Sequence, residues 1–397
     1  MRTLVHNETE ERAGNTDLLL SVIATIEDFD AIKTDWNDLC AGAIEYCPML
    51  SHNWLRSWWE AFCEGYELYI MLAWRDDQLV GAAPLAYQTR TTYLRRRRVI
   101  TGLSNVWVDR FHFLMTAPQE PIVDLFLDHL ANAAPPWDLI ELHPLEESSP
   151  QTKLLAAALN ERAICFGVTA SHQSPELTLA SDWDATLQAL SSSFRQTVKR
   201  KIRKAEKAGS VEMQITTESS CIDDIMTISL ESWQHDNGTS MASTDQIRNF
   251  YSQIIRGAAN DGSLLVGLMS IDGEPAAFEF NLICGSKLHN LKLGFRRRYA
   301  HLSPGIVLKA FVLRSILASQ SDVRLTEYDF MGTSEPYKLS WTDSIRSHCR
   351  IVVFSDSIDL RFAHWVAFQF KPFVRRSMPW LVSLLSTVKS FVKKLRE

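Results

Sequence analysis

The sequence of 397 residues lacks long hydrophobic runs and closely spaced cysteines. Nowhere do about 18 uncharged apolar residues follow one another, the least that a membrane-spanning helix needs. The first residues also lack the apolar stretch of a secretory signal. The seven cysteines are scattered without a Cys-x-x-Cys pair, which argues against a zinc site or a disulfide framework. We therefore expect a cytoplasmic protein that needs no metal.

Charge is distributed unevenly along the chain. Residues 1–194 contain 13 Lys and Arg against 27 Asp and Glu, a net charge of −14, whereas residues 195–397 contain 28 against 20, a net charge of +8. The acidic first half makes a nucleic acid an unlikely partner, while the basic second half suits a phosphorylated ligand or an anionic surface.

Domain boundaries have to be inferred from the spacing of hydrophobic segments, because no low-complexity linker divides the chain. Two strand-turn-strand segments of equal length, 68–88 and 264–284, each follow a Trp-containing helix and indicate a degenerate tandem duplication; two unrelated hairpins are the alternative. We predict four parts: a flexible N-terminus (1–17), an α/β domain (18–180), a second α/β domain (181–358) and a basic amphipathic helical tail (359–397).

The most informative segment, residues 288–317, reads as a strand, a basic loop and a helix that begins at Ser303-Pro304-Gly305. Serine favours the N-cap position, where its hydroxyl accepts a backbone N–H, and proline favours the first helical position. The free N–H groups of a helix start can bind a pyrophosphate. Gly305 would let a ligand approach closely, and three arginines, Arg296, Arg297 and Arg298, would bond to phosphates. A capped structural helix beside a solvated loop is the alternative.

Several motifs follow one another in a set order: Gly273-Glu274-Pro275-Ala276-Ala277-Phe278, Leu293-Gly294-Phe295, Leu302-Ser303-Pro304-Gly305, Tyr328-Asp329-Phe330-Met331-Gly332 and Glu335-Pro336-Tyr337-Lys338-Leu339-Ser340-Trp341. The set resembles the GNAT-type acyltransferases associated with cellulose and exopolysaccharide biosynthesis, over residues 30–355. The resemblance implies two tandem GNAT-like modules, each a mixed, mostly antiparallel sheet flanked by helices, as in the related Fem-type aminoacyltransferases.

The same resemblance implies that the second module binds an acyl donor, most simply acetyl-CoA, through Leu293, Gly294, the three arginines and Ser303-Pro304-Gly305. Two departures bear on this expectation. The chain has Arg296-Arg297 where the family usually has Asp-Pro, and Thr333 where an acid commonly follows the glycine.

Acyl transfer from a thioester requires a base for the acceptor, donors for the oxyanion and an acid for the leaving thiolate. In GNAT proteins two neighbouring strands diverge at the thioester, here implied to be 288–295 and 325–331. Candidate bases near that point are Asp329, Glu279 and His289, each with a structural alternative. By the same resemblance Tyr337 would protonate the thiolate. Lys338 would bind an acceptor carboxylate or phosphate, or pair with Glu335.

Two further basic segments need a partner. Residues 195–207 contain seven bases and one acid, with residues 195, 199, 203 and 207 on one helical stripe. An anionic ligand or the acidic first half of the chain would neutralise this stripe. The tail, 361–397, has eight bases and one acid among many aromatic residues, a composition that suits an anionic membrane surface or packing on the catalytic domain.

These features predict an acyltransferase that moves an acyl group, simplest an acetyl group, to an amine or hydroxyl of a sugar or polysaccharide precursor. A Fem-like transferase that uses aminoacyl-tRNA and a non-catalytic adaptor of a polysaccharide-synthesis assembly are the alternatives.

Overall fold

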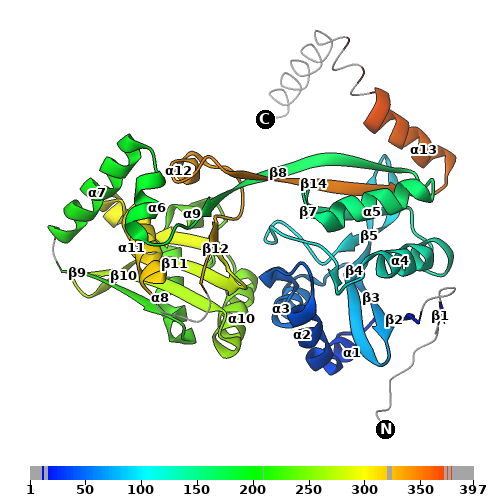
Figure 1. Cartoon of the computed structure of the whole chain (residues 1–397), viewed down its shortest axis with the longest axis horizontal. Coiled ribbons are helices and arrows are strands. Elements are labelled where there is room, and N and C mark those ends of the chain that lie inside the picture. Colours follow the sequence, from blue (N-terminus) through cyan, green and yellow to red (C-terminus); the bar gives the residue numbers. More distant parts are fainter. Residues whose placement is uncertain are drawn as a thin grey trace.

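The computed structural model describes residues 11–12, 17–208, 210–319, 324–370, 373 and 377 (Figure 1). The predicted flexible segment 1–17 and the tail beyond residue 370 therefore lie almost wholly outside the described residues. The strands are β1 (Glu11–Arg12), β2 (Leu19–Ile23), β3 (Tyr66–Arg75), β4 (Gln78–Thr92), β5 (Arg95–Gly102), β6 (Leu114–Met115), β7 (Leu139–Glu146), β8 (Phe166–Thr178), β9 (Val211–Thr216), β10 (Leu264–Ile271), β11 (Glu274–Cys284), β12 (Lys287–Phe295), β13 (Glu327–Asp329) and β14 (Ile345–Phe354).

The helices are α1 (Ile26–Ala31), α2 (Lys33–Gly42), α3 (His52–Phe62), α4 (Glu120–Asn132), α5 (Pro150–Glu161), α6 (Trp183–Ala189), α7 (Ser192–Glu206), α8 (Ile222–Leu230), α9 (Trp233–Asp236), α10 (Asp245–Asp261), α11 (Pro304–Ala318), α12 (Pro336–Leu339) and α13 (Ile358–Trp365). Short 3₁₀ helices span Pro48–Leu50, Ser219–Cys221 and Arg297–Leu302. None of the described helices is long and apolar enough to cross a bilayer.

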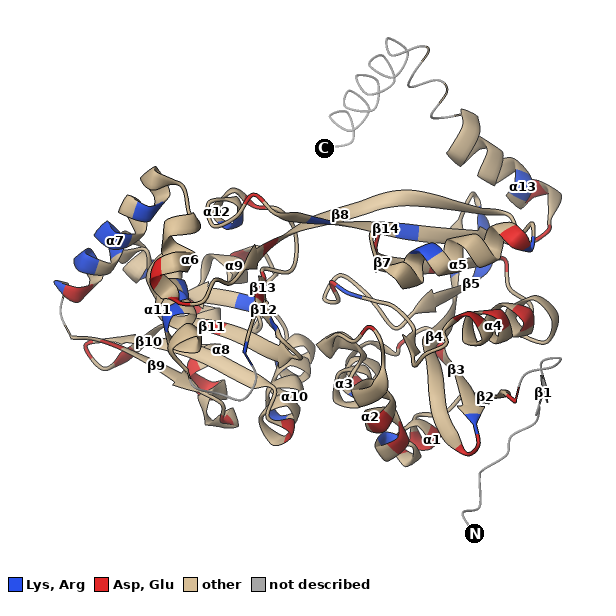
Figure 2. Ribbon diagram, viewed as in Figure 1, with Lys and Arg blue, Asp and Glu red and all other residues tan. Residues whose placement is uncertain are grey.

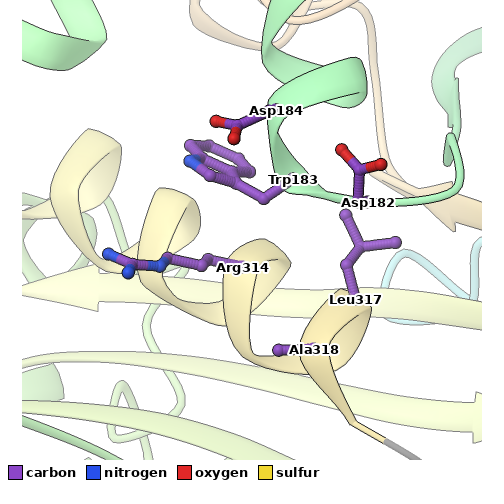
Figure 3. Close-up of a pocket in the computed structure, with 6 residues that line it drawn as sticks. All are labelled: Asp182, Trp183, Asp184, Arg314, Leu317 and Ala318. Atoms are coloured by element: carbon purple, nitrogen blue, oxygen red, sulfur yellow. The ribbon is translucent and has the colours of Figure 1, made fainter.

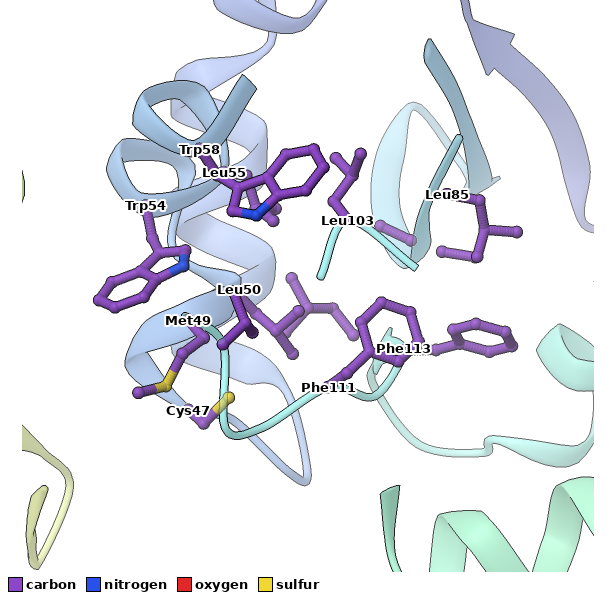
Figure 4. Close-up of a cluster of buried hydrophobic side chains, with 14 of the residues drawn as sticks. Cys47, Met49, Leu50, Trp54, Leu55, Trp58, Leu85, Leu103, Phe111 and Phe113 are labelled. Atoms are coloured by element: carbon purple, nitrogen blue, oxygen red, sulfur yellow. The ribbon is translucent and has the colours of Figure 1, made fainter. Parts of the chain in front are cut away.

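The first lobe contains the elements from β2 to β8 together with β14. Its helix α3 begins where the Ser51 hydroxyl accepts the N–H of Trp54 at 3.1 Å, a standard N-cap. The tryptophans of α3 then pack on apolar side chains from the Cys47–Leu50 segment, from β4 and from the loop after β5 (Figure 4). Burial of these large side chains stabilises the lobe and fixes the loop of residues 103–113.

The second lobe contains the elements from α6 to α12. Period-two alternation along β11 turns Phe278 and Phe280 toward α8 and α10, whereas Ala277 and Glu279 face the opposite side of the sheet, which α6, α7 and α11 cover. The sheet is thus buried on both faces. Glu279 and Asn281 alternate with the phenylalanines along β11, and both side chains are buried.

The two lobes share strands, so that all the described strands except β6 follow one continuous order, β1-β2-β3-β4-β5-β7-β14-β8-β13-β12-β11-β10-β9. Strand β14, near the end of the described chain, lies between β7 and β8 of the first lobe. Strand β8 pairs with β14 over most of its length and then with β13 of the second lobe, through Glu176, Leu177 and Thr178. Figure 1 shows β8 and β14 as the long arm between the lobes.

Helices α3 and α10 form a second contact between the lobes. The Phe250 ring of α10 lies 5.4 Å from the Trp54 ring and 5.2 Å from the Phe62 ring, both edge-on. Edge-to-face aromatic pairs at this spacing are favourable. Together with the shared strands, this contact makes the lobes one packed body.

Candidate functional site

Strands β12 and β13 diverge in the middle of the second lobe. They pair in parallel at three positions only, the last being His289 with Asp329. Strand β12 continues to Phe295, whereas the chain after Asp329 turns away through Met331 and Gly332, both with positive φ. Backbone groups of β12 beyond residue 289 therefore have no β13 partner.

The start of α11 differs from the predicted cap. Ser303 has left-handed backbone angles, φ 58° and ψ 54°, and its hydroxyl makes no capping bond. A capping hydroxyl normally belongs to an extended residue, and here the Ser303 carbonyl accepts the N–H groups of Ile306 and Val307 instead. Pro304 occupies the first helical position as predicted. A Cβ added to Gly305 would lie 3.1 Å from the Leu293 side chain, so Leu293 of β12 packs against this turn.

Gly294 has a packing role in the structure. A Cβ at this position would lie 2.5 Å from the Phe278 ring of the neighbouring strand. The glycine therefore lets an aromatic side chain cross β12.

All three arginines of the predicted donor site are paired with carboxylates. Arg296 is buried and lies 2.5 Å from Glu231, and it also donates to the Pro275 carbonyl. Arg296, Arg297 and Arg298 form ion pairs with Glu231, Asp236 and Glu274, respectively. Paired in this way, the loop offers a phosphate little uncommitted positive charge. The residues thus fit the pyrophosphate of CoA through backbone N–H groups more than through arginine side chains.

Glu279 belongs to a fully buried polar network on the α11 side of the sheet. The Tyr328 hydroxyl donates to its Oε1 at 2.7 Å, and the Lys309 ammonium of α11 lies 3.3 Å from its Oε2. Lys309 also contacts the Tyr328 hydroxyl. Burial lowers the pKa of Lys309 to about 8, opposed by the neighbouring carboxylate. Both carboxylate oxygens of Glu279 therefore already have partners within the protein.

Asp329 is fully buried at the junction of the lobes. Arg110 of the first lobe donates to both of its oxygens, at 2.7 and 2.9 Å, and Arg346 of β14 donates to one at 3.2 Å. Burial favours the protonated form, but Arg110, His289 and Arg346 together hold the pKa of Asp329 well below its usual range. An ionised carboxylate so strongly stabilised is a weak proton acceptor near neutral pH.

His289 of β12 lies beside the Asp329 carboxylate. Its Nδ1 is 3.6 Å from Asp329 Oδ2, too far for a hydrogen bond. Among the described residues, neither ring nitrogen of this buried histidine has a hydrogen-bond partner. Buried polar atoms are normally bonded, so an imidazole left unbonded at the point where the strands diverge indicates a place for a ligand.

Tyr337 and Lys338 lie on the short helix α12. Tyr337 is half-exposed, and partial burial with the nearby Glu335 and Glu279 charges raises its pKa, so the hydroxyl keeps its proton at neutral pH. Lys338 is buried; it donates to the Met331 and Thr333 carbonyls at 2.8 and 3.0 Å and pairs with Glu335 at 2.7 Å. The pairing with Glu335 is one of its two predicted roles, and the contacts fix the turn after β13.

The first lobe contributes residues that the sequence did not indicate. Besides Arg110, Trp107 places its ring 5.0 Å from the Lys292 ammonium of β12, within cation–π range. Burial lowers the pKa of Lys292, and Asp109 opposes this. Nothing in the local sequence marks these residues, because their partners lie in the other half of the chain.

A pocket of about 440 Å³ lies away from these residues (Figure 3). Arg314, Leu317 and Ala318 from the C-terminal end of α11 face Asp182, Trp183 and Asp184 at the start of α6. The pocket is at the opposite end of α11 from Ser303. Among the described residues, no three His, Cys, Asp or Glu side chains are grouped to hold a metal ion.

Two histidines in the sheet of the first lobe, His348 of β14 and His143 of β7, predict an acid-sensitive fold. Burial, reinforced by Arg110, lowers the pKa of His348 to about 2, and burial with Arg350 lowers that of His143 to about 4. Below pH 6.5 these histidines bind protons in the unfolded chain but stay neutral in the folded chain. The free energy of unfolding therefore decreases as the pH is lowered, by about 1 kcal/mol for each histidine at pH 5.5. Urea unfolding at pH 7.5 and 5.5 measures the loss. We expect His348→Gln to reduce it by about 1 kcal/mol, and an unchanged loss would contradict this assignment.

Comparison with known proteins agrees with this geometry. Residues 192–339 match the family described as acetyltransferase (GNAT) domain. No curated protein matches the sequence. In structure the chain is similar to FemX, with a TM-score of 0.60 and 10% identity over 84% of this chain and 98% of that one.

It is also similar to L-PGS from Bacillus licheniformis (TM-score 0.51, 9% identity, 83% and 95% covered). A third similar structure is the C-terminal domain of a putative lysylphosphatidylglycerol synthetase from Agrobacterium fabrum (TM-score 0.51, 8% identity, 85% and 96% covered). The predicted α/β fold with GNAT-like modules is thus confirmed, and the second lobe is acyltransferase-like.

Proposed function

We propose that this protein transfers an acyl group from a pantetheine thioester, acetyl-CoA being the simplest, to an amine or hydroxyl of an acceptor. The observation that carries the proposal is the divergence of β12 and β13 at His289 within a segment that matches an acetyltransferase family. A sugar or polysaccharide precursor as the acceptor is supported by the sequence resemblance alone.

In the proposed reaction His289 accepts the proton of the acceptor. The Asp329 carboxylate near Nδ1 favours the tautomer protonated there, which leaves Nε2 as the acceptor atom. The acceptor nitrogen or oxygen bonds to the acyl carbon, and backbone N–H groups of β12 beyond residue 289 stabilise the oxyanion. The carbon–sulfur bond then breaks, and the Tyr337 hydroxyl donates its proton to the thiolate.

The other residues of the site position these groups. Asp329 places its negative charge beside Nδ1 of His289 and is itself fixed by Arg110. Glu279 anchors Tyr328, the residue before Asp329, to α11 through Lys309. Lys338 fixes the turn that follows β13 and lies beside the Tyr337 ring.

Release of free thiol from acetyl-CoA in the presence of a panel of amino sugars, hydroxylated sugars and amines tests the function. Tyr337→Phe is expected to lower turnover about a hundredfold, because the thiolate would leave unprotonated. The control Tyr93→Phe, in the exposed turn between β4 and β5, should retain the wild-type rate. Equal rates in the wild type and Tyr337→Phe would remove this tyrosine from the mechanism.

A Fem-like transfer from aminoacyl-tRNA is the second candidate, because FemX has the most similar fold of the three structures compared. Binding of aminoacyl-tRNA with a steep salt dependence would favour it. Stabilisation by acetyl-CoA without thiol release from any acceptor would favour an adaptor.

We also propose that the protein works at an anionic membrane surface. Within the described part of the tail, Phe362, Trp365 and Phe370 stack in an exposed row, with ring distances of 5.9 and 5.2 Å. Exposed aromatic rings beside a basic segment suit the lipid interface. In flotation with anionic liposomes we expect the full chain to rise with the lipid and a chain ending at residue 360 to remain below. Equal recovery of both would contradict the membrane contact.

A further inference from the structure

Helix α7 carries a basic face that the rest of the described protein leaves uncovered. Three of its bases, Lys199, Arg200 and Arg203, are exposed and have no hydrogen bond or ion pair with any described residue. The predicted alternative, neutralisation by the acidic first half, is therefore not realised among the described residues. Figure 2 shows these charges along the outer edge of the second lobe, away from the first. Like charges at this spacing repel one another, and an anionic partner would relieve the repulsion.

The position of α7 connects this face with the donor side of the site. At one end Phe194 packs against Trp341, just after α12, with the ring centroids 5.2 Å apart. At the other end Lys204 donates to the His301 carbonyl at 2.8 Å, in the loop that leads to Ser303. The basic face thus flanks the path from the start of α11 to Tyr337.

Charge is available on α7 but not in the loop predicted to bind the donor. Arg296, Arg297 and Arg298 are each paired with a carboxylate, and Leu293 packs against Gly305. The phosphates of free CoA would have to displace these partners to gain charge-assisted bonds. An anionic donor that contacts α7 itself would not have to displace any carboxylate.

We propose that α7 docks an acidic carrier protein that presents the acyl group on a phosphopantetheine arm. The inference rests on the proposed function and names the source of its thioester. The arm has the same thiol end as CoA, so it can enter the gap between β12 and β13 while the carrier stays outside. An acidic helix of the carrier would pair with the exposed bases at 199, 203 and 207, which follow one another at i, i+4 spacing.

The length of α7 favours a small protein over other polyanions. Helix α7 has 15 residues, a length of about 22 Å, which matches one helix of a small domain. A long nucleic acid or a planar membrane would extend well beyond this helix, whereas one helix of a small protein would match its length.

The decisive experiment measures binding of fluorescently labelled holo-acyl carrier protein by anisotropy, and turnover with acetyl-carrier and with acetyl-CoA. The test variant is Lys199→Glu/Arg203→Glu/Lys207→Glu. The matched control, Arg96→Glu/Lys153→Glu/Arg256→Glu, changes the net charge equally at exposed bases outside α7.

We expect the α7 variant to weaken carrier binding at least tenfold and to lower kcat/KM for acetyl-carrier by a similar factor, because both depend on electrostatic docking. Its kcat/KM for acetyl-CoA should stay within twofold of wild type, and the control should change neither. Wild-type carrier binding should weaken as salt is raised from 50 to 300 mM.

Carrier binding that is absent in the wild type, or equal in the α7 variant, would overturn the proposal. So would binding of bulk tRNA or anionic vesicles that depends on α7 while carrier binding does not, which would reassign the helix. Failure of the proposed function gives a different result: carrier binding through α7 without acyl transfer from either donor.

Discussion

Replacing Arg110 by methionine is expected to lower the free energy of unfolding by about 3–5 kcal/mol, the usual cost of leaving a buried charge without its partner. Asp329 is fully buried, and Arg110 supplies two of its hydrogen bonds from the other lobe. Arg346 alone cannot compensate, because it is shared with Glu146, Glu176 and Glu327. Urea unfolding measures the change.

Arg96→Ala serves as the control, since Arg96 is exposed, and should cost less than about 0.5 kcal/mol. In the double variant Arg110→Met/Asp329→Leu both charges are removed together, so the loss should be well below the sum of the two single losses. Additive losses would show that the pair does not connect the lobes energetically.

Replacing His289 by alanine is expected to lower kcat by about 10²–10⁴-fold, the usual contribution of a positioned base. The KM for acetyl-CoA should change little, because the imidazole contacts the acceptor side of the thioester in the proposed reaction. Added imidazole should restore part of the rate in His289→Ala, since the small base can enter the space that the side chain leaves. A purely structural histidine would show no such rescue.

His364→Ala is the matched control, because this histidine lies on α13 of the first lobe, where its Nε2 faces the Phe166 carbonyl. It should retain wild-type turnover with and without imidazole. Wild-type turnover in His289→Ala would leave the reaction without an identified base.

Local features of the sequence predicted the second lobe well. The Asp272-Gly273 turn places both residues at positive φ between β10 and β11, as a tight hairpin requires. The bounds of β12 and α11 agree with the prediction to within one residue. These elements are determined by turn chemistry and hydrophobic periodicity, which act over a few residues.

Long-range contacts could not be predicted in this way. The four arginines of residues 95–98 lie in the β4–β5 hairpin, where pairing with β4 and ion pairs such as Arg97 with Asp138, 41 residues away, stabilise an extended chain. Likewise, Arg110 and Asp329 are 219 residues apart. The sequence identified both Asp329 and His289 as candidate bases. Only tertiary packing shows that arginines bind the Asp329 carboxylate, whereas the His289 ring has no hydrogen-bond partner among the described residues.

The position of β14 has a consequence for biosynthesis. Residues 345–354 fill the place between β7 and β8, so a nascent chain that has released its first 180 residues still exposes two unpaired strand edges. Such edges are prone to intermolecular association. The sheet of the first lobe can therefore be completed only after residues 345–354 have been synthesised. A fragment ending before residue 345 would leave the edges of β7 and β8 that β14 covers unpaired.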